Sequence, residues 1–227
     1  MASYTFDFSF LNSYRVEIMH GVVLTVVMSC IAMALGLAVG IAAAIARVYG
    51  PPPLRRATVV YIEGIRNTPL IIQVFWIFFG LAILHVRLSA FVAAVIALAI
   101  NVGAYTAEII RAGLNSIHRG QVEAASCLAL SRRQTVFHVM LPQALERMYP
   151  ALISQFILLM LASSLMSQIS VDELTGAGYM IQSFTFRGFE VYLVIAVVYL
   201  VLAVLLRMSC AALALFIFPR RRRLNRG

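Results

Sequence analysis

Long apolar runs without charged residues fill most of this chain and predict its secondary structure. With histidine neutral, five such intervals follow one another, and each is near the about 20 residues that a helix needs to cross a bilayer. The intervals run from Ile18 to Ala46, Asn67 to Val86, Leu88 to Ala107, Met148 to Val171, and Val191 to Leu206, continuing past Arg207 to Phe218. The pattern predicts an all-α membrane protein with about five transmembrane helices in a single domain, residues 1–227.

Helix-breaking residues mark the turns between these predicted helices. Pro51-Pro52-Pro53 separates the first helix from the second, and Gly80 to Arg87 forms a short turn before the third. Gly176 to Glu190, rich in glycine and aromatic residues, precedes the fifth. An odd number of spans places the two ends of the chain on opposite sides of the membrane.

The arginines predict the orientation of the chain. With the N-terminus outside, thirteen arginines fall in inner segments and three, Arg15, Arg87 and Arg187, fall outside. Inner loops of membrane proteins carry the excess of positive charge, so we expect the N-terminus outside and the C-terminus inside. The run from Arg220 to Arg223 is expected to anchor the last helix to anionic lipid headgroups rather than to bind nucleic acid.

Composition excludes two broad classes. Hydrophobic residues make up 62% of the chain and charged residues 12%, far from the values of a water-soluble domain. All basic residues are arginine, so the lysine-containing phosphate loop of many ATPases cannot form in this sequence. Three widely spaced cysteines suggest neither a disulfide framework nor a metal site. We therefore expect no catalytic residues, no metal and no cofactor on this chain.

The segment from Ile110 to Leu141 is the longest polar stretch inside. Gly120 precedes an acidic turn that leads into helix-forming residues, and Ser131 with Gln134 has the spacing of a capping box. Pro142 stands where the next helix should begin. We expect two short helices on the inner face; a plain amphipathic interfacial loop is the alternative.

Polar residues inside the predicted spans are candidates for function, because ionisable groups are costly in a bilayer. Two pairs of opposite charges are spaced three residues apart and can form ion pairs, Glu63 with Arg66 and Glu108 with Arg111. We favour a purely structural role for both pairs. A possible translocation path, or a set of hydrogen bonds between helices, is formed by Asn101, Tyr105, Glu108, Ser163, Ser164, Ser167 and Gln168. Gly36 and Gly40 are expected to pack locally rather than at a dimer seam.

The sequence of residues 103–111, Gly-Ala-Tyr-Thr-Ala-Glu-Ile-Ile-Arg, opens a longer signature. The signature continues with Ser116-Ile117, Gly120-Gln121, Glu123-Ala124-Ala125 and Leu141-Pro142-Gln143, and is joined by Tyr61-Ile62-Glu63, Arg66-Asn67-Thr68-Pro69-Leu70, Gln73 and Val171-Asp172-Glu173-Leu174. Together these residues resemble the membrane permease subunits of bacterial ABC importers for polar amino acids. The resemblance extends from about residue 21 to 216.

The resemblance implies a transmembrane subunit of an ATP-driven importer in the bacterial inner membrane. Its partners would be an ABC ATPase dimer that binds ATP and Mg, a second permease subunit, identical or related, and a periplasmic or extracellular amino-acid-binding protein. The inner loop would hold a coupling helix that docks on the ATPase, with Gly120, Gln121, Glu123, Ala124, Ala125 and Ala129 as the implied residues. A secondary transporter or channel driven by an ion gradient is the alternative, although five spans without inverted halves argue against it.

The chain departs from the family pattern at two places. Ala129 stands where the family usually has glycine, and because alanine disfavours positive φ we expect the coupling helix to end differently or to continue into Leu130. Leu161-Ala162-Ser163-Ser164-Leu165 replaces the usual Lys-Asp-Thr-Ser-Leu, which removes two charges from the fourth helix.

Overall fold

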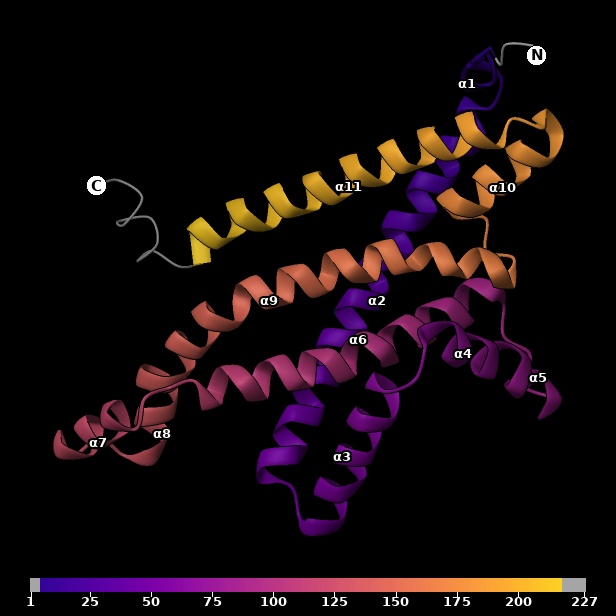
Figure 1. Cartoon of the computed structure of the whole chain (residues 1–227). Coiled ribbons are helices and arrows are strands. Elements are labelled where there is room, and N and C mark those ends of the chain that lie inside the picture. The colour runs from indigo at the N-terminus through magenta and orange to yellow at the C-terminus, as the bar shows by residue number, and fades with distance from the viewer. Residues whose placement is uncertain (1–4, 218–227) are drawn as a thin grey trace.

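The computed structural model describes residues 5–217, and these residues form helices and connecting turns with no strand (Figure 1). Four helices are long and apolar enough to cross a membrane, and a fifth span is present if one bent pair is counted together. The predicted all-α membrane fold is therefore confirmed. The arginine run 220–223 lies outside the described residues.

The centre of the fold is the packing of α2 (Arg15–Tyr49) on α6 (Ala90–Asn115), the largest contact between two elements. Glycines allow the close approach. A Cβ at Gly36 would lie 1.9 Å from Val102 Cγ1, and one at Gly40 would lie 2.6 Å from Thr106 Cβ. The expected local role of the two glycines is confirmed, because both contacts are made within this chain.

The second predicted span differs from the observed one. Instead of one helix from Asn67 to Val86, the chain forms α3 (Pro52–Arg66), then α4 (Leu70–Phe75), the π-helix η1 (Trp76–Gly80) and α5 (Leu81–Ile83). A bend of 112° separates Pro52–Arg66 from Leu70–Ile83, and the second part is shorter than a full span.

The bend has a local cause at residues 67–69. Pro69 lacks an N–H and disfavours helical backbone at the residue before it, so α3 cannot continue. The side chain of Gln73 reaches back and donates to the carbonyls of Ile65, at 2.8 Å, and Thr68, at 3.0 Å. The interruption therefore keeps its backbone acceptors bonded, as a break at membrane depth requires.

The polar segment after α6 forms one separate helix rather than two. α7 (Arg119–Cys127) stands alone, whereas α8 (Arg132–Gln134), the π-helix η2 (Thr135–Met140), α9 (Leu141–Ala162) and the 3₁₀ helix η3 (Ser163–Ile169) run on as one helix of 38 residues. The expectation that a new helix begins at Pro142 was therefore wrong. The helix accommodates Pro142 because the wider turns of η2 precede it. Gln143 Nε2 also donates to the Val139 carbonyl at 2.9 Å, close to where Pro142 lacks an N–H.

Two further helices complete the bundle. α10 (Leu174–Thr185) is short and packs on α2, and α11 (Gly188–Ile217) crosses the bundle beside α9. The short α1 (Phe10–Ser13) and α10 lie at one end of the bundle, and α7 and α8 lie at the other (Figure 1). The two ends are called the α10 end and the α7 end below.

Candidate coupling helix and intramembrane polar groups

Both ends of α7 are capped by local hydrogen bonds. At its start, the His118 ring nitrogen Nδ1 accepts from the Gly120 N–H at 3.1 Å. At its end, the N–H of Ala129 donates to Ser126 O at 3.0 Å and that of Leu130 to Ala125 O at 3.1 Å. This pair of bonds is the Schellman motif, which stops a helix through a residue in the left-handed conformation.

Ala129 occupies that left-handed position, with φ of 54°. We expected an alanine here to change the end of the helix or to extend it, and this was wrong. The two capping hydrogen bonds hold the turn, although a residue with a Cβ is less stable in this conformation by about 1–2 kcal/mol.

The exposed side of α7 differs in part from the expected docking residues. Glu123, Ala124, Cys127 and Leu128 are exposed, and their spacing places them on one face of the helix, here called the docking face. Leu128, the residue directly after α7, is 75% exposed and adds an apolar side chain to this face. Cys127 and Leu128 were missed by the sequence analysis, although their i+4 and i+5 spacing from Glu123 could have found them.

Ala125 lies on the opposite side of the helix. It is 3% exposed and belongs to the side of α7 that packs on η2. Gln121 is half-buried, and its Oε1 has no hydrogen-bond partner among the described residues. Of the six residues implied for coupling, Ala125 therefore serves the internal packing of the chain.

Two contacts hold the chain segments directly before and after α7. Ser131 and Gln134 form the predicted capping box, in which the Ser131 N–H donates to Gln134 Oε1 at 2.9 Å and Ser131 Oγ accepts from the Gln134 N–H at 3.3 Å. Arg147 of α9 donates to the carbonyl of Ser116, directly after α6. The first contact lies at the start of the helix that continues through η2 into α9, and the second joins α9 to the end of α6.

Glu108 stands at the centre of a group of three charges near the α7 end. It pairs with Arg111, as its spacing predicts, and also with Arg47 of α2, where Arg47 Nη1 lies 2.8 Å from Glu108 Oε2. The second pair joins α2 to α6 and could not be predicted from the sequence, because the two residues are 61 positions apart.

The other predicted pair is absent from the described residues. Glu63 accepts a hydrogen bond from Asn67 Nδ2 at 3.2 Å, while the Arg66 guanidinium lies 5.5 Å from the centre of the Tyr105 ring. Arg66 Nε is buried and has no hydrogen-bond partner in the part of the chain described. The end of α3 at Arg66 explains the difference, because Asn67 caps the helix and bonds Glu63 itself.

Two of the predicted path residues line a common cleft. Asn101 and Tyr105 of α6 face a cleft of about 390 Å³ between α4, α6 and α9. Asn101 Nδ2 donates to Gln73 Oε1 at 3.0 Å, so the α4 amide that supports the bend also orients Asn101. The remaining lining residues are Thr68, Pro69, Leu70, Leu98, Gln155, Leu158, Leu159, Ala162 and Leu165.

The predicted path serines of the fourth span bond within their own helix rather than to other helices. Residues 163–169 are 3₁₀ rather than α-helical, and this geometry aligns residues three apart. The hydroxyls of Ser163, Ser164 and Ser167 each donate to the carbonyl three residues back, at 2.7 to 2.8 Å. Ser167 and Gln168 instead line a separate cleft of about 440 Å³ beside α10. The predicted path residues therefore lie at more than one place.

Comparison with known proteins identifies the family to which this chain belongs. The model of the family "Binding-protein-dependent transport system inner membrane component" matches residues 36–222. The glutamine transport system permease protein GlnP of Escherichia coli K12 is 42% identical over 163 residues, which are 71% of this chain and 74% of that protein. The L-cystine transport system permease protein TcyB of Bacillus subtilis is 46% identical over 122 residues, 54% of this chain and 52% of that protein.

Solved structures agree with this result. The crystal structure of an amino acid ABC transporter with histidines is 35% identical, with a TM-score of 0.87 over 92% of this chain and 98% of that one. The MetNI methionine ABC transporter shares the fold, at 20% identity and a TM-score of 0.75 over 90% of this chain and 98% of that one. The chain thus belongs to the family of binding-protein-dependent transport system inner membrane components, and it is a multi-pass permease subunit of an ATP-driven importer.

Proposed function

We propose that this permease subunit carries a polar amino acid into the cell and that α7 receives the stroke of a separate ATPase. The proposed substrate class is supported by relatives named for glutamine and L-cystine transport and by the similar amino acid ABC transporter structure. On the distribution of arginine, the α7 end faces the cytoplasm and the N-terminus lies outside.

The docking face of α7 is the observation that carries the coupling role. A short helix outside the spans exposes an apolar leucine beside Ala124, whose small side chain permits close approach, and Glu123 adds a directional charge. Because α7 packs on η2, which continues into α9, and Arg147 of α9 donates to Ser116 at the end of α6, we expect a push on this face to move α6 and α9 together.

The remaining parts of the proposed machine lie on other chains. An ATPase dimer binds ATP and Mg and hydrolyses ATP, a second permease subunit, identical or related, completes the path, and a binding protein delivers the amino acid outside. The absence of lysine from this sequence supports the division, since a phosphate loop needs one. The cleft with Asn101 and Tyr105 is the proposed part of the path in this subunit.

The decisive experiment substitutes Ala124→Arg on the docking face. A long charged side chain should overpack the contact with the ATPase and bury an unpaired charge, which together cost about 3 kcal/mol or more. Ser183→Arg, at an exposed position of α10, adds the same charge at the other end of the bundle and is the matched control. Ala125 is unsuitable for this test because it is buried in the chain itself.

Membrane level, co-purification with the ATPase, and ATP-dependent amino-acid uptake into proteoliposomes are measured for both variants. We expect the Ala124→Arg chain to reach the membrane normally but to lose ATPase association and uptake together, while Ser183→Arg retains both. Normal association and uptake in Ala124→Arg would show that α7 is an ordinary interfacial helix. Uptake that continues without ATP and follows an ion gradient would contradict the mechanism itself.

A further inference from the structure

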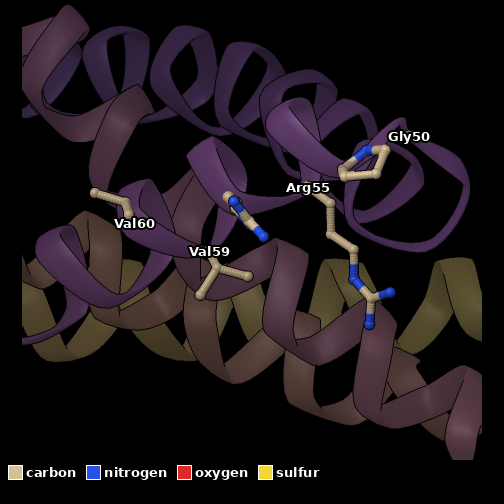
Figure 2. A pocket seen from close by; sticks show the side chains of 6 residues that line it. Gly50, Arg55, Val59 and Val60 are labelled. Atoms are coloured by element: carbon tan, nitrogen blue, oxygen red, sulfur yellow. The ribbon is translucent and has the colours of Figure 1, made fainter.

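A cleft of about 620 Å³ lies where α2 turns into α3, at the α7 end of the bundle (Figure 2). It is lined by Gly50, Pro52, Arg55, Arg56, Val59 and Val60. None of these residues belongs to the coupling helix or to the cleft around Asn101, so the proposed function leaves this site without a role.

The turn that forms the cleft is sterically fixed. A Cβ at Gly50 would lie 2.3 Å from the carbonyl oxygen of Ala46, so only glycine fits where α2 ends. Pro51 is extended, and α3 starts at Pro52, a position where the missing N–H has no cost. The two helices therefore leave the turn at a defined angle, and the cleft does not depend on a flexible loop.

Charged and apolar side chains are paired along α3 at the spacing of one helical turn. Arg55 precedes Val59 by four residues, and Arg56 precedes Val60 by four, so each arginine lies next to a valine on the helix surface. In Figure 2 the Arg55 and Val59 side chains extend to the same side of α3. The cleft thus presents two positive charges toward the turn and an apolar wall farther along the helix.

Neither arginine has a partner within the part of the chain that the structure describes. No carboxylate lies within 4.0 Å of Arg55 or Arg56, and neither guanidinium makes a hydrogen bond there. Glu108 is engaged by Arg47 and Arg111. The N-terminus of α3 adds a partial positive charge to the same region. The cleft therefore offers an anion two positive charges that are unpaired among the described residues.

The surroundings indicate that this anion carries hydrocarbon. Val60 is 71% exposed, and Val48, Tyr49 and Leu54 around the turn are also exposed. The charge-free run of α2 ends just before Arg47, which places the turn at the level where hydrocarbon gives way to headgroups.

We propose that this cleft binds one anionic phospholipid, with the headgroup phosphate held by Arg55 and Arg56 and the acyl chains lying along Val59 and Val60. Two adjacent guanidinium groups can donate forked hydrogen bonds to phosphate oxygens, a geometry suited to arginine. The bound lipid would fill the angle between α2 and α3 and stabilise the turn from outside. The inference does not depend on the proposed substrate or on the role of α7.

The test measures lipid binding to the purified full-length chain by native mass spectrometry. The probe is palmitoyl-oleoyl phosphatidylglycerol, and phosphatidylcholine with the same acyl chains is the reference. For Arg55→Gln with Arg56→Gln we expect phosphatidylglycerol affinity to fall by about 30-fold, because each arginine near an anionic lipid surface contributes about fivefold. Arg132→Gln with Arg133→Gln, another adjacent and exposed pair, is the matched control and should change affinity by less than about twofold.

A second variant separates a lipid from a free anion. Val60→Ser should weaken phosphatidylglycerol binding but leave the binding of inorganic phosphate itself unchanged, because only the lipid contacts the valine. The proposal is overturned if both arginine pairs lose affinity equally, or if Val60→Ser binds phosphatidylglycerol as tightly as the parent chain, since the site would then hold only a free anion. It is also overturned if the Arg55 and Arg56 variant binds phosphatidylglycerol normally but no longer associates with the ATPase, since the cleft would then be a protein contact.

Discussion

The carboxylate of Glu173 accepts a hydrogen bond from the Tyr199 hydroxyl at 2.6 Å, in a position where Glu173 has no exposed surface. The same carboxylate accepts from the N–H groups of Thr175 and Gly176, both at 2.9 Å, and so caps the start of α10. Thr25 of α2 completes the group at 3.4 Å. One side chain therefore joins α2, α10 and α11.

The first prediction concerns the loss of this carboxylate. Each carboxylate oxygen of Glu173 accepts from a backbone N–H, so in either orientation the amide nitrogen of Glu173→Gln would face an N–H that it cannot bond. We expect a loss of about 2 kcal/mol in the free energy of unfolding, the cost of leaving buried groups unsatisfied. Tyr199→Phe removes a single donor and should cost less. Thermal unfolding of the detergent-solubilised chain measures both, and an unchanged melting temperature in Glu173→Gln would contradict the prediction.

The second prediction is the pH dependence of the same group. Burial raises the pKa of the Glu173 carboxyl above its ordinary value. The folded chain then binds this proton more tightly than the unfolded chain, so the associated stabilisation is complete below the ordinary pKa and is lost as the pH rises through the raised one. The difference in the free energy of unfolding between the parent chain and Glu173→Gln should therefore decrease as the pH rises over that range. If that difference instead increases with rising pH, the pKa of Glu173 is lowered in the folded chain and the prediction is wrong.

The sequence predicted those features that depend on composition and spacing along one helix. The long spans α2, α6 and α11 follow from charge-free runs, and the Ser131 capping box from a three-residue spacing. The burial of Glu173 could not be predicted, because two acidic residues in Val171-Asp172-Glu173-Leu174 indicate an exposed polar turn. Its partners Thr25 and Tyr199 are distant in the sequence and approach Glu173 only in the folded chain. The difference between Ala124 and Ala125 likewise depends on which side of α7 meets η2. The bend at Pro69 was missed because it lies in a charge-free run. A three-residue interruption does not change the hydropathy of such a run enough to be noticed.

The third prediction tests the packing of α2 on α6. Gly36→Ala would place a Cβ 1.9 Å from Val102 and 3.0 Å from the Ala99 carbonyl, so α2 and α6 must move apart. We expect destabilisation of about 1–3 kcal/mol. Gly64→Ala is the matched control, because a Cβ there meets no atom within 4 Å. Alanine should stabilise that helical position by about 0.5–1 kcal/mol. Equal melting temperatures for the two variants would contradict the close packing.

The fourth prediction concerns the group of charges around Glu108. Glu108→Gln leaves Arg47 and Arg111 without their carboxylate, whereas Arg47→Gln leaves the pair of Glu108 with Arg111 in place. Removing the shared partner should therefore cost more, on the order of 2 kcal/mol against about 1 kcal/mol or less for the arginine. Melting temperatures of the single variants and the double variant form a mutant cycle. Additive effects would show that Arg47 and Glu108 do not interact.

The last prediction uses one substitution at two positions of the coupling segment. Ala129 has a φ of 54°, a conformation in which glycine is favoured, so Ala129→Gly should stabilise the end of α7 by about 1 kcal/mol. Ala124 lies inside the helix, where Ala124→Gly should destabilise it by a similar amount. Hydrogen exchange of the α7 amides in the purified importer should therefore slow in the first variant and accelerate in the second. If both variants accelerate exchange, the left-handed turn at Ala129 is not the end of the helix, and α7 ends by another geometry.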